Sequence, residues 1–174
     1  MDKIGFGGNC YWCSEAIFQS LKGISLVMSG WITSEGEYSM PSEGVIVEFD
    51  PTIIPLEALV AIHLYTHSCT ADHNLRVKYR SAIYTYTEGQ DAIAQRAIEK
   101  LQMEYENPII TGVIPCKRFI ANKESFQNYY YSNPEKPFCK NIINPKLKRL
   151  RMQFLREVDA DRLKHLNISE FDEK

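Results

Sequence analysis

Residues 3–23 read Lys-Ile-Gly-Phe-Gly-Gly-Asn-Cys-Tyr-Trp-Cys-Ser-Glu-Ala-Ile-Phe-Gln-Ser-Leu-Lys-Gly. The short apolar run at 3–8 predicts a buried strand, and helical apolar spacing at 14–22 predicts a helix that ends at Gly23. Cys10 and Cys13 lie between the two. Backbone N–H groups at a helix N-terminus carry partial positive charge, so a thiol there ionises below its usual pKa of ~8.5. This stretch therefore predicts a strand–turn–helix unit that presents a sulfur nucleophile.

Patterns beyond this unit predict further strands and helices. Strands are expected at 24–32, 45–49, 80–86 and 111–121, and helices at 56–65, 89–105 and 124–131. The order β-α-β-β-α-β-α-β favours an α+β fold with helices packed on a mixed or antiparallel sheet around a ferredoxin-like βαββαβ core. A thioredoxin-like topology is the alternative. We expect an irregular C-terminal region, including an excursion at 134–145.

Length and composition indicate the class of protein. The chain has 174 residues, of which 44% are apolar and 24% charged, as suits one compact domain. We expect a single catalytic domain over 1–174, with its core at about 3–158 and a frayed acidic tail at 167–174. We also expect a monomer.

Charge and hydropathy argue against two kinds of partner. The net charge of −2 gives no general attraction to nucleic acid or to an acidic membrane. No apolar run approaches the ~20 residues of a membrane span. The segment 140–156 is locally basic, with six Lys or Arg and no acid. We interpret it as a helix with one core face and one solvated basic face, in preference to an anion-binding site.

Five cysteines make an odd number in a chain too large to need disulfide stapling. A reducing compartment is therefore expected, and no secretory signal is recognisable at the N-terminus, so we place the protein in the cytoplasm. We assign no role to Cys69 or Cys116.

A pair of cysteines three residues apart can be a redox couple, half of a metal site, or a coincidence in a buried segment. Structural zinc requires four ligands, usually two such pairs or one pair with histidines. The other cysteines are isolated, and His63 and His67 are the one histidine pair at helical spacing. We therefore favour the redox couple and expect neither a metal nor a cofactor.

Four segments, in order, carry a resemblance to a known family. Residues 7–13 resemble the Gly-Gly-Gly-Cys-Phe-Trp signature of the A-type peptide methionine sulfoxide reductases. Residues 43–51 resemble that family's glutamate-led strand ending in Asp-Pro, and residues 78–83 its Gln-Tyr-Arg-Ser-Ala-Ile segment. Residues 126–129 are similar to its His-Gln-x-Tyr element, so the resemblance covers roughly residues 4–150.

The resemblance implies a thiol-dependent reductase of methionine S-sulfoxide, free or in proteins. Cys10 would attack the sulfoxide sulfur and become a sulfenic acid, and thioredoxin would reduce the disulfide that follows. Glu43 would be the proton donor, because desolvation in an apolar pocket favours the protonated carboxyl group. Tyr79 would bind the sulfoxide oxygen, and Tyr11 and Trp12 would receive the substrate methyl group.

Two thiols are candidates for the resolving cysteine that condenses with the sulfenic acid. Cys13 is nearest in sequence, and closure is feasible if Cys10 caps the helix. Cys139 lies in a proline-bounded segment that we interpret as a loop mobile enough to reach the site. We prefer Cys13 and keep Cys139 as the alternative.

The chain departs from the family pattern at several positions. Asn9 replaces a glycine, and Tyr11 replaces phenylalanine. Asn74 stands where the resemblance predicts an aspartate, and it can hydrogen-bond but not ionise. Tyr38, or else Trp31, is a rough counterpart of a family tyrosine. We expect Asn74 and Tyr38 to contribute to substrate binding.

Two other functions fit the same residues. A thioredoxin-like disulfide oxidoreductase would use Cys10 and Cys13 and would not need Glu43. A catalytically weakened member would bind the sulfoxide, or zinc, without turnover.

Overall fold

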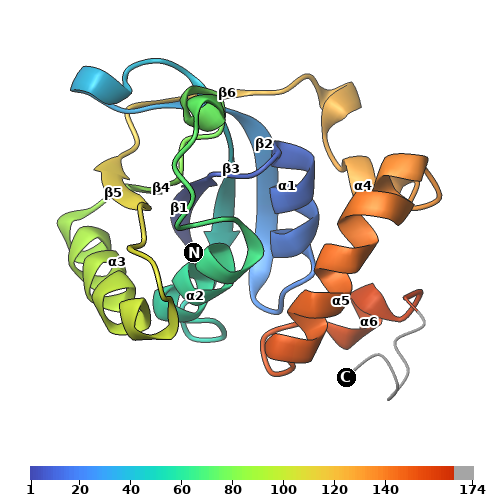
Figure 1. The fold of residues 1–174 in the computed structure, drawn as a ribbon. Coiled ribbons are helices and arrows are strands. Elements are labelled where there is room, and N and C mark those ends of the chain that lie inside the picture. The colour runs from blue at the N-terminus through green and yellow to red at the C-terminus, as the bar shows by residue number, and fades with distance from the viewer. Residues whose placement is uncertain (167–174) are drawn as a thin grey trace.

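One sheet with helices against it makes up the fold (Figure 1), and the computed structural model describes residues 1–166. The acidic tail expected at 167–174 lies outside the described residues. The strands are β1 (Asp2–Gly7), β2 (Ile24–Thr33), β3 (Ser42–Phe49), β4 (Ala82–Thr85), β5 (Gly112–Pro115) and β6 (Arg118–Ala121). The α-helices are α1 (Tyr11–Gln19), α2 (Leu56–Thr66), α3 (Glu88–Leu101), α4 (Tyr129–Ser132), α5 (Asn144–Gln153) and α6 (Ala160–Leu163). Shorter turns are η1 (Gly36–Tyr38), η2 (Asn74–Val77), η3 (Gln102–Glu104), η4 (Glu124–Phe126) and the π-helical η5 (Cys139–Ile143).

The sheet has the order β5-β4-β1-β3-β2-β6. Its four central strands, β4-β1-β3-β2, are all antiparallel and are linked by α1 and α2, which is the predicted ferredoxin-like βαββαβ arrangement. β5 pairs in parallel with β4, and β6 pairs antiparallel with β2. The prediction of an α+β fold with a mixed sheet is confirmed.

The predicted single strand at 111–121 is instead two strands on opposite edges of the sheet. Two residues link them: Cys116 donates its N–H to the Thr85 carbonyl at 2.9 Å, and Lys117 donates to the Thr33 carbonyl at 3.0 Å. The sheet must therefore curl until its edges approach each other. Pro115 ends β5, because it has no N–H to continue a ladder. A periodic pattern cannot show that its two halves pair with different neighbours.

The two faces of the curled sheet are filled differently. On the convex side, side chains of α1, α2, α3 and α5 form the main core with β1 and β3, and Phe6 stacks on Phe18 with ring centroids 4.6 Å apart. The concave side holds a smaller cluster around Ile32, Ile46 and Tyr84. Gly30 permits close approach there, since a Cβ at Gly30 would lie 2.2 Å from the Ile120 carbonyl oxygen.

The predicted irregular excursion at 134–145 contains ordered helical structure. Its second half is η5, which runs directly into α5, and Cys139 is fully buried at the start of η5. Cys139 therefore does not lie in a mobile loop. Pro145 misleads the sequence interpretation, because it is the second residue of α5, at the junction with η5, where the helix accommodates a proline. The helix predicted at 124–131 is likewise shortened to η4 and α4.

Within residues 1–166, no helix is both long and apolar enough to cross a membrane.

Candidate active site

Cys10 is the N-cap residue of α1, so the helix begins three residues before the start predicted at residue 14. Its φ of −53° and ψ of 133° are not helical, and its carbonyl accepts the first helical hydrogen bond from the Ser14 N–H at 3.1 Å. Cysteine is not a preferred N-cap residue, which explains why the sequence pattern placed the start too late. The sulfur therefore lies at the positive end of the helix.

The surroundings of Cys10 favour its thiolate. A hydrogen bond with the Cys13 thiol and the backbone N–H groups of Trp12 and Cys13 lower the pKa of Cys10 to about 7. Burial and the charge of Glu43 act in the opposite direction but are outweighed. The same hydrogen bond, together with burial, raises the pKa of Cys13 far above its usual value. One proton is thus held on Cys13 while Cys10 ionises.

We predict that Cys13→Ala raises the pKa of Cys10 from about 7 toward ~8.5, because it removes the largest stabilising contact of the thiolate. The measurement is the rate of iodoacetamide labelling at Cys10 against pH, followed by mass spectrometry. Cys139→Ala is the matched control, and it should leave the midpoint in place. An unchanged midpoint in Cys13→Ala would refute the assigned cause.

Glu43 points toward the same helix end from β3. Its residue is 5% exposed, and its carboxylate accepts a hydrogen bond from the Tyr11 N–H at 3.4 Å. Burial raises the pKa of Glu43, while that hydrogen bond and Lys78 lower it in part. The Lys78 ammonium group lies 3.9 Å from the carboxylate and is half-exposed. A buried carboxyl group next to a thiolate is suited to proton donation.

The loop that carries Tyr79 is fastened to the start of β3. Glu43 donates its N–H to the Lys78 carbonyl, and the Ser42 hydroxyl donates to the same carbonyl, both at 2.8 Å. Arg80 in turn donates its N–H to the Ser42 hydroxyl at 2.7 Å. Tyr79 is thereby held half-buried in the wall of the cleft that also contains Cys10.

The aromatic pair after Cys10 divides between two sets of contacts. The Tyr11 ring meets Trp31 edge-on at 6.1 Å, whereas Trp12 stacks on Tyr129 with centroids 4.0 Å apart. Phe138 packs edge-on against Trp12 at 6.1 Å. The sequence interpretation did not assign a role to Tyr129 or Phe138. The sequence features that could have identified them are that Tyr129 ends the fourth segment resembling the family and that Phe138 directly precedes Cys139.

Three of the five cysteines converge on this end of α1. Cys139 is close enough to Cys13 for its charge to raise the pKa of Cys13, and burial raises the pKa of Cys139 itself. Cys13 therefore contacts Cys10, Cys139 lies close to Cys13, and both candidate resolving thiols are buried. Cys69 is buried elsewhere in the main core, and Cys116 borders the concave cluster.

The turn before Cys10 is fixed by buried polar contacts. Arg76 donates to the Gly8 carbonyl at 3.0 Å, and the Asn9 amide donates to the Thr66 carbonyl at 3.0 Å. Gly8 has φ +128°, and a Cβ there would lie 2.7 Å from the His67 ring. Glycine is therefore required at this position.

His67 and His63 form part of this support. Nε2 of His67 lies 2.8 Å from the Ser81 hydroxyl, which lies 2.8 Å from the Thr111 hydroxyl. Burial lowers the pKa of His67 to about 4, so its ring is neutral near pH 7. The described residues contain no group of three or more His, Cys, Asp or Glu side chains that could hold a metal ion.

A cleft of about 420 Å³ opens beside Cys10. Gly8, Asn9 and Cys10 form one side, and Tyr79 lies in the wall. The lining contains three permanently cationic side chains, those of Arg76, Lys146 and Arg149, together with the rings of His67 and His73.

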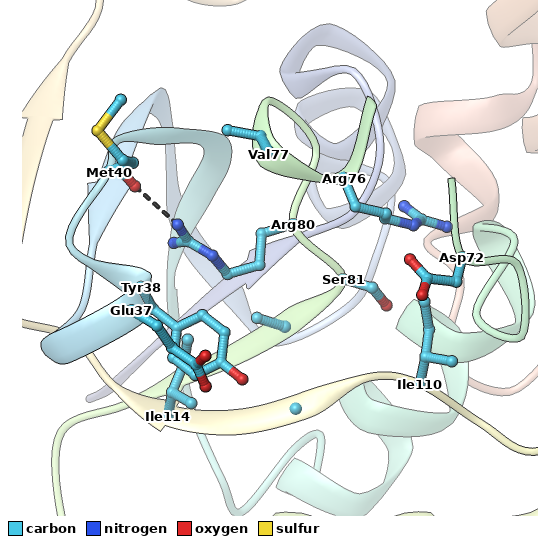
Figure 2. Close-up of a pocket in the computed structure, with 12 residues that line it drawn as sticks. Glu37, Tyr38, Met40, Asp72, Arg76, Val77, Arg80, Ser81, Ile110 and Ile114 are labelled. Atoms are coloured by element: carbon cyan, nitrogen blue, oxygen red, sulfur yellow. Dashed lines mark hydrogen bonds between the residues drawn. The ribbon is translucent and has the colours of Figure 1, made fainter. Parts of the chain in front are cut away.

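Of the predicted site residues, Cys10 and Tyr79 line this cleft, whereas Glu43, Tyr11, Trp12, Tyr38 and Asn74 are not part of its lining. Tyr38 lines a separate cavity of about 430 Å³ on the concave side, where Arg80 lies over its ring at 5.4 Å (Figure 2). Asn74 is exposed at the start of η2, next to His73. Trp31, the alternative to Tyr38, is the residue that contacts Tyr11.

Comparisons with known proteins agree with this arrangement. Residues 2–158 match the family model described as Peptide methionine sulfoxide reductase. The peptide methionine sulfoxide reductase MsrA of Nitratiruptor sp. is 36% identical over 162 residues, covering 85% of this chain and 93% of that protein. The MsrA of Trichodesmium erythraeum is 34% identical over 176 residues, covering 92% and 99%.

Solved structures share the fold. Mxr1 from Saccharomyces cerevisiae in its reduced form superposes with a TM-score of 0.70 at 21% identity, covering 79% of this chain and 88% of that one. Methionine sulfoxide reductase A of Corynebacterium diphtheriae superposes with a TM-score of 0.62 at 24% identity, covering 78% and 76%. Since the family model spans nearly the whole chain, this protein belongs to the peptide methionine sulfoxide reductase family.

Proposed function

We propose that this protein reduces the S epimer of methionine sulfoxide to methionine, with Cys10 as the nucleophile. The observation that carries the proposal is a cysteine at the N-terminus of α1, with a pKa of about 7, beside the buried carboxyl group of Glu43. A thiolate and a proton donor are the two groups that attack on a sulfoxide requires.

In the first step, the Cys10 thiolate forms a bond to the sulfoxide sulfur while Glu43 protonates the sulfoxide oxygen. Collapse transfers that hydroxyl group to the Cys10 sulfur and releases methionine, so Cys10 becomes a sulfenic acid and the substrate sulfur is reduced. Substrate binding removes water from Glu43 and strengthens the desolvation that already raises its pKa. The Lys78 ammonium then offsets the charge left on the ionised carboxylate.

The aromatic residues would orient the substrate. Tyr11 and Trp12 present flat apolar faces beside the nucleophile, and such faces make favourable contacts with sulfur and methyl groups. Stacking on Tyr129 holds the Trp12 ring in one orientation. From the wall of the cleft, the Tyr79 hydroxyl would donate a hydrogen bond to the sulfoxide oxygen.

In the second step, a neighbouring thiol condenses with the sulfenic acid, which forms a disulfide and releases water. We propose Cys13 as this thiol, because it already hydrogen-bonds to Cys10 and keeps its proton. Cys139 is the alternative, since it lies close to Cys13.

A dithiol must then reduce the disulfide, and we propose thioredoxin for this role. One structural neighbour is Mxr1 from Saccharomyces cerevisiae in complex with Trx2, with a TM-score of 0.59. Recycling by thiol–disulfide exchange requires a reducing compartment, which together with the odd number of cysteines supports a cytoplasmic location.

The decisive experiment is a single turnover without reductant. Reduced protein is mixed with an excess of methionine S-sulfoxide, methionine is quantified, and the protein is mapped by mass spectrometry. We expect one methionine for each disulfide formed and a bond between Cys10 and Cys13. In Cys13→Ser we expect a sulfenic acid trapped by dimedone at Cys10, or a bond from Cys10 to Cys139.

The R epimer serves as the matched control and should release no methionine. Absence of methionine with the S epimer would refute the proposed function. In Cys139→Ser, where Cys139 cannot exchange with a disulfide of Cys10, a disulfide that excludes Cys10 would refute the assigned nucleophile.

A further inference from the structure

The cleft beside Cys10 carries an uneven distribution of charge. His73 and Arg76 enter it from the loop before Tyr79, and Lys146 and Arg149 enter it from α5. Its lining includes no Asp or Glu. Within residues 1–166, no carboxylate forms an ion pair with Lys146, Arg149 or His73. The cleft is therefore positive directly beside the proposed nucleophile.

Arg76 has little capacity for a ligand. Its guanidinium group donates to four backbone carbonyls, those of Ala71, Gly8, Tyr79 and Ser68, at 2.6–3.0 Å. Four of its five N–H groups are used in this way. Arg76 therefore holds the loop and the turn in place and adds charge to the cleft.

Lys146 and Arg149 are differently placed. The Lys146 ammonium donates a hydrogen bond at 3.1 Å to the side-chain oxygen of Asn9, the residue that precedes Cys10. Two further N–H groups of the ammonium remain to bind a ligand. Its charge acts on the Cys13 sulfur, since it lowers the pKa of Cys13. Arg149 lies three residues further along the same helix, so the two cations share one face of α5.

We propose that Lys146 and Arg149 bind a carboxylate of the substrate, so that this protein prefers methionine sulfoxides with a negative charge close to the sulfoxide. The carboxylate can be the free α-carboxylate of a C-terminal residue or the side chain of an adjacent Asp or Glu. This inference rests on the proposed function and specifies its substrate class. Asn74 adds no negative charge beside His73, at the position where the family pattern has an aspartate.

The same charges disfavour a substrate ammonium group. A free amino acid brings a positive amine next to its carboxylate, and the cations of the cleft repel it. N-acylation removes that charge. N-acetylmethionine S-sulfoxide should therefore be a better substrate than the free amino acid, and much better than N-acetylmethionine S-sulfoxide amide.

The test measures kcat/KM with dithiothreitol as reductant, so that no protein reductant contacts the cleft. We expect the N-acetyl acid to exceed its amide about tenfold at low salt, and this ratio to fall in about 0.3 M salt. In capped peptides, kcat/KM should be highest with Asp after the methionine sulfoxide, lower with Asn and lowest with Lys. The first comparison tests the α-carboxylate, and the second tests the side chain.

Variants connect the preference to the cleft. Lys146→Gln and Arg149→Gln should each lower the acid-to-amide ratio several-fold. Lys148→Gln removes one positive charge from the same helix but outside the cleft. This control variant should leave the acid-to-amide ratio of kcat/KM unchanged.

Equal kcat/KM for acid and amide would overturn the inference while leaving the proposed function intact, since both substrates would still be reduced. No turnover of any substrate would instead overturn the proposed function. If Lys146→Gln lowered kcat/KM equally for the acid and the amide, Lys146 would support the turn at Asn9 and would not select the substrate. A charge effect seen with thioredoxin but not with dithiothreitol would assign the cleft to the reductant and would also overturn the inference.

Discussion

Cys10→Ser is expected to abolish reduction of methionine S-sulfoxide, with a loss of about 10⁴-fold or more in kcat/KM. A serine hydroxyl does not ionise near pH 7, and removal of a covalent nucleophile typically has an effect of this size. The variant should still fold, because serine is a preferred N-cap residue and Cys10 occupies the N-cap position. The measurement is methionine released per enzyme with dithiothreitol as reductant.

Cys69→Ser is the matched control: it makes the same substitution at a cysteine outside the site, although Cys69 is buried whereas Cys10 is partly exposed. It should keep its activity, provided that circular dichroism shows it to be folded. Sustained turnover by Cys10→Ser would exclude Cys10 as the nucleophile and would redirect attention to Cys13 and Cys139.

Glu43→Gln is expected to lower kcat by ~10²–10⁴, the range for loss of a general acid. Glutamine has nearly the same shape and can still accept the hydrogen bond from the Tyr11 N–H, but it cannot deliver a proton. The charge of Glu43 raises the pKa of Cys10, so this pKa should fall in the variant. Activity and thiol reactivity should thus change in opposite directions.

The experiment measures kcat against pH together with iodoacetamide labelling of Cys10. Glu48→Gln provides the control, because Glu48 is on the same strand but pairs with Lys3 at 3.4 Å, away from the cleft. If Glu43→Gln kept full activity, the proton would have to come from another group, and the role assigned to Glu43 would be wrong.

The same variant separates the proposed reductase from a disulfide oxidoreductase. Reduction of insulin disulfides by Cys10 and Cys13 needs no acid to protonate a sulfoxide oxygen. An oxidoreductase would therefore keep its insulin activity in Glu43→Gln, whereas the proposed enzyme should reduce insulin poorly both before and after the change.

Much of the fold was predictable, because local patterns decide most of its central elements. The apolar alternation of β3 and the helical spacing of α2 and α3 lead to elements close to those observed. The split of 111–121 was not predictable, because it depends on which edges of a curled sheet meet. Long-range pairing leaves no local period in the sequence.

The site shows the same division between local and long-range information. Cys10 and Cys13 are recognisable from their spacing beside a strand–helix junction. In contrast, the contact of Trp12 with Tyr129 joins residues more than a hundred positions apart. Pro137 and Pro145 predict a loop around Cys139, but Pro145 lies in the first turn of α5. Burial of Cys139 becomes visible only when the helices pack.

The edge strands β5 and β6, which the two-residue link joins, also affect whether another polypeptide can pair with the sheet. The outermost strands of the sheet have four residues each, so they offer little unpaired backbone as a template for a foreign strand. A reductase that acts on methionine sulfoxide within extended protein segments would meet backbone able to pair with a sheet edge. Its short edge strands, β5 and β6, should keep it from aggregating with such segments.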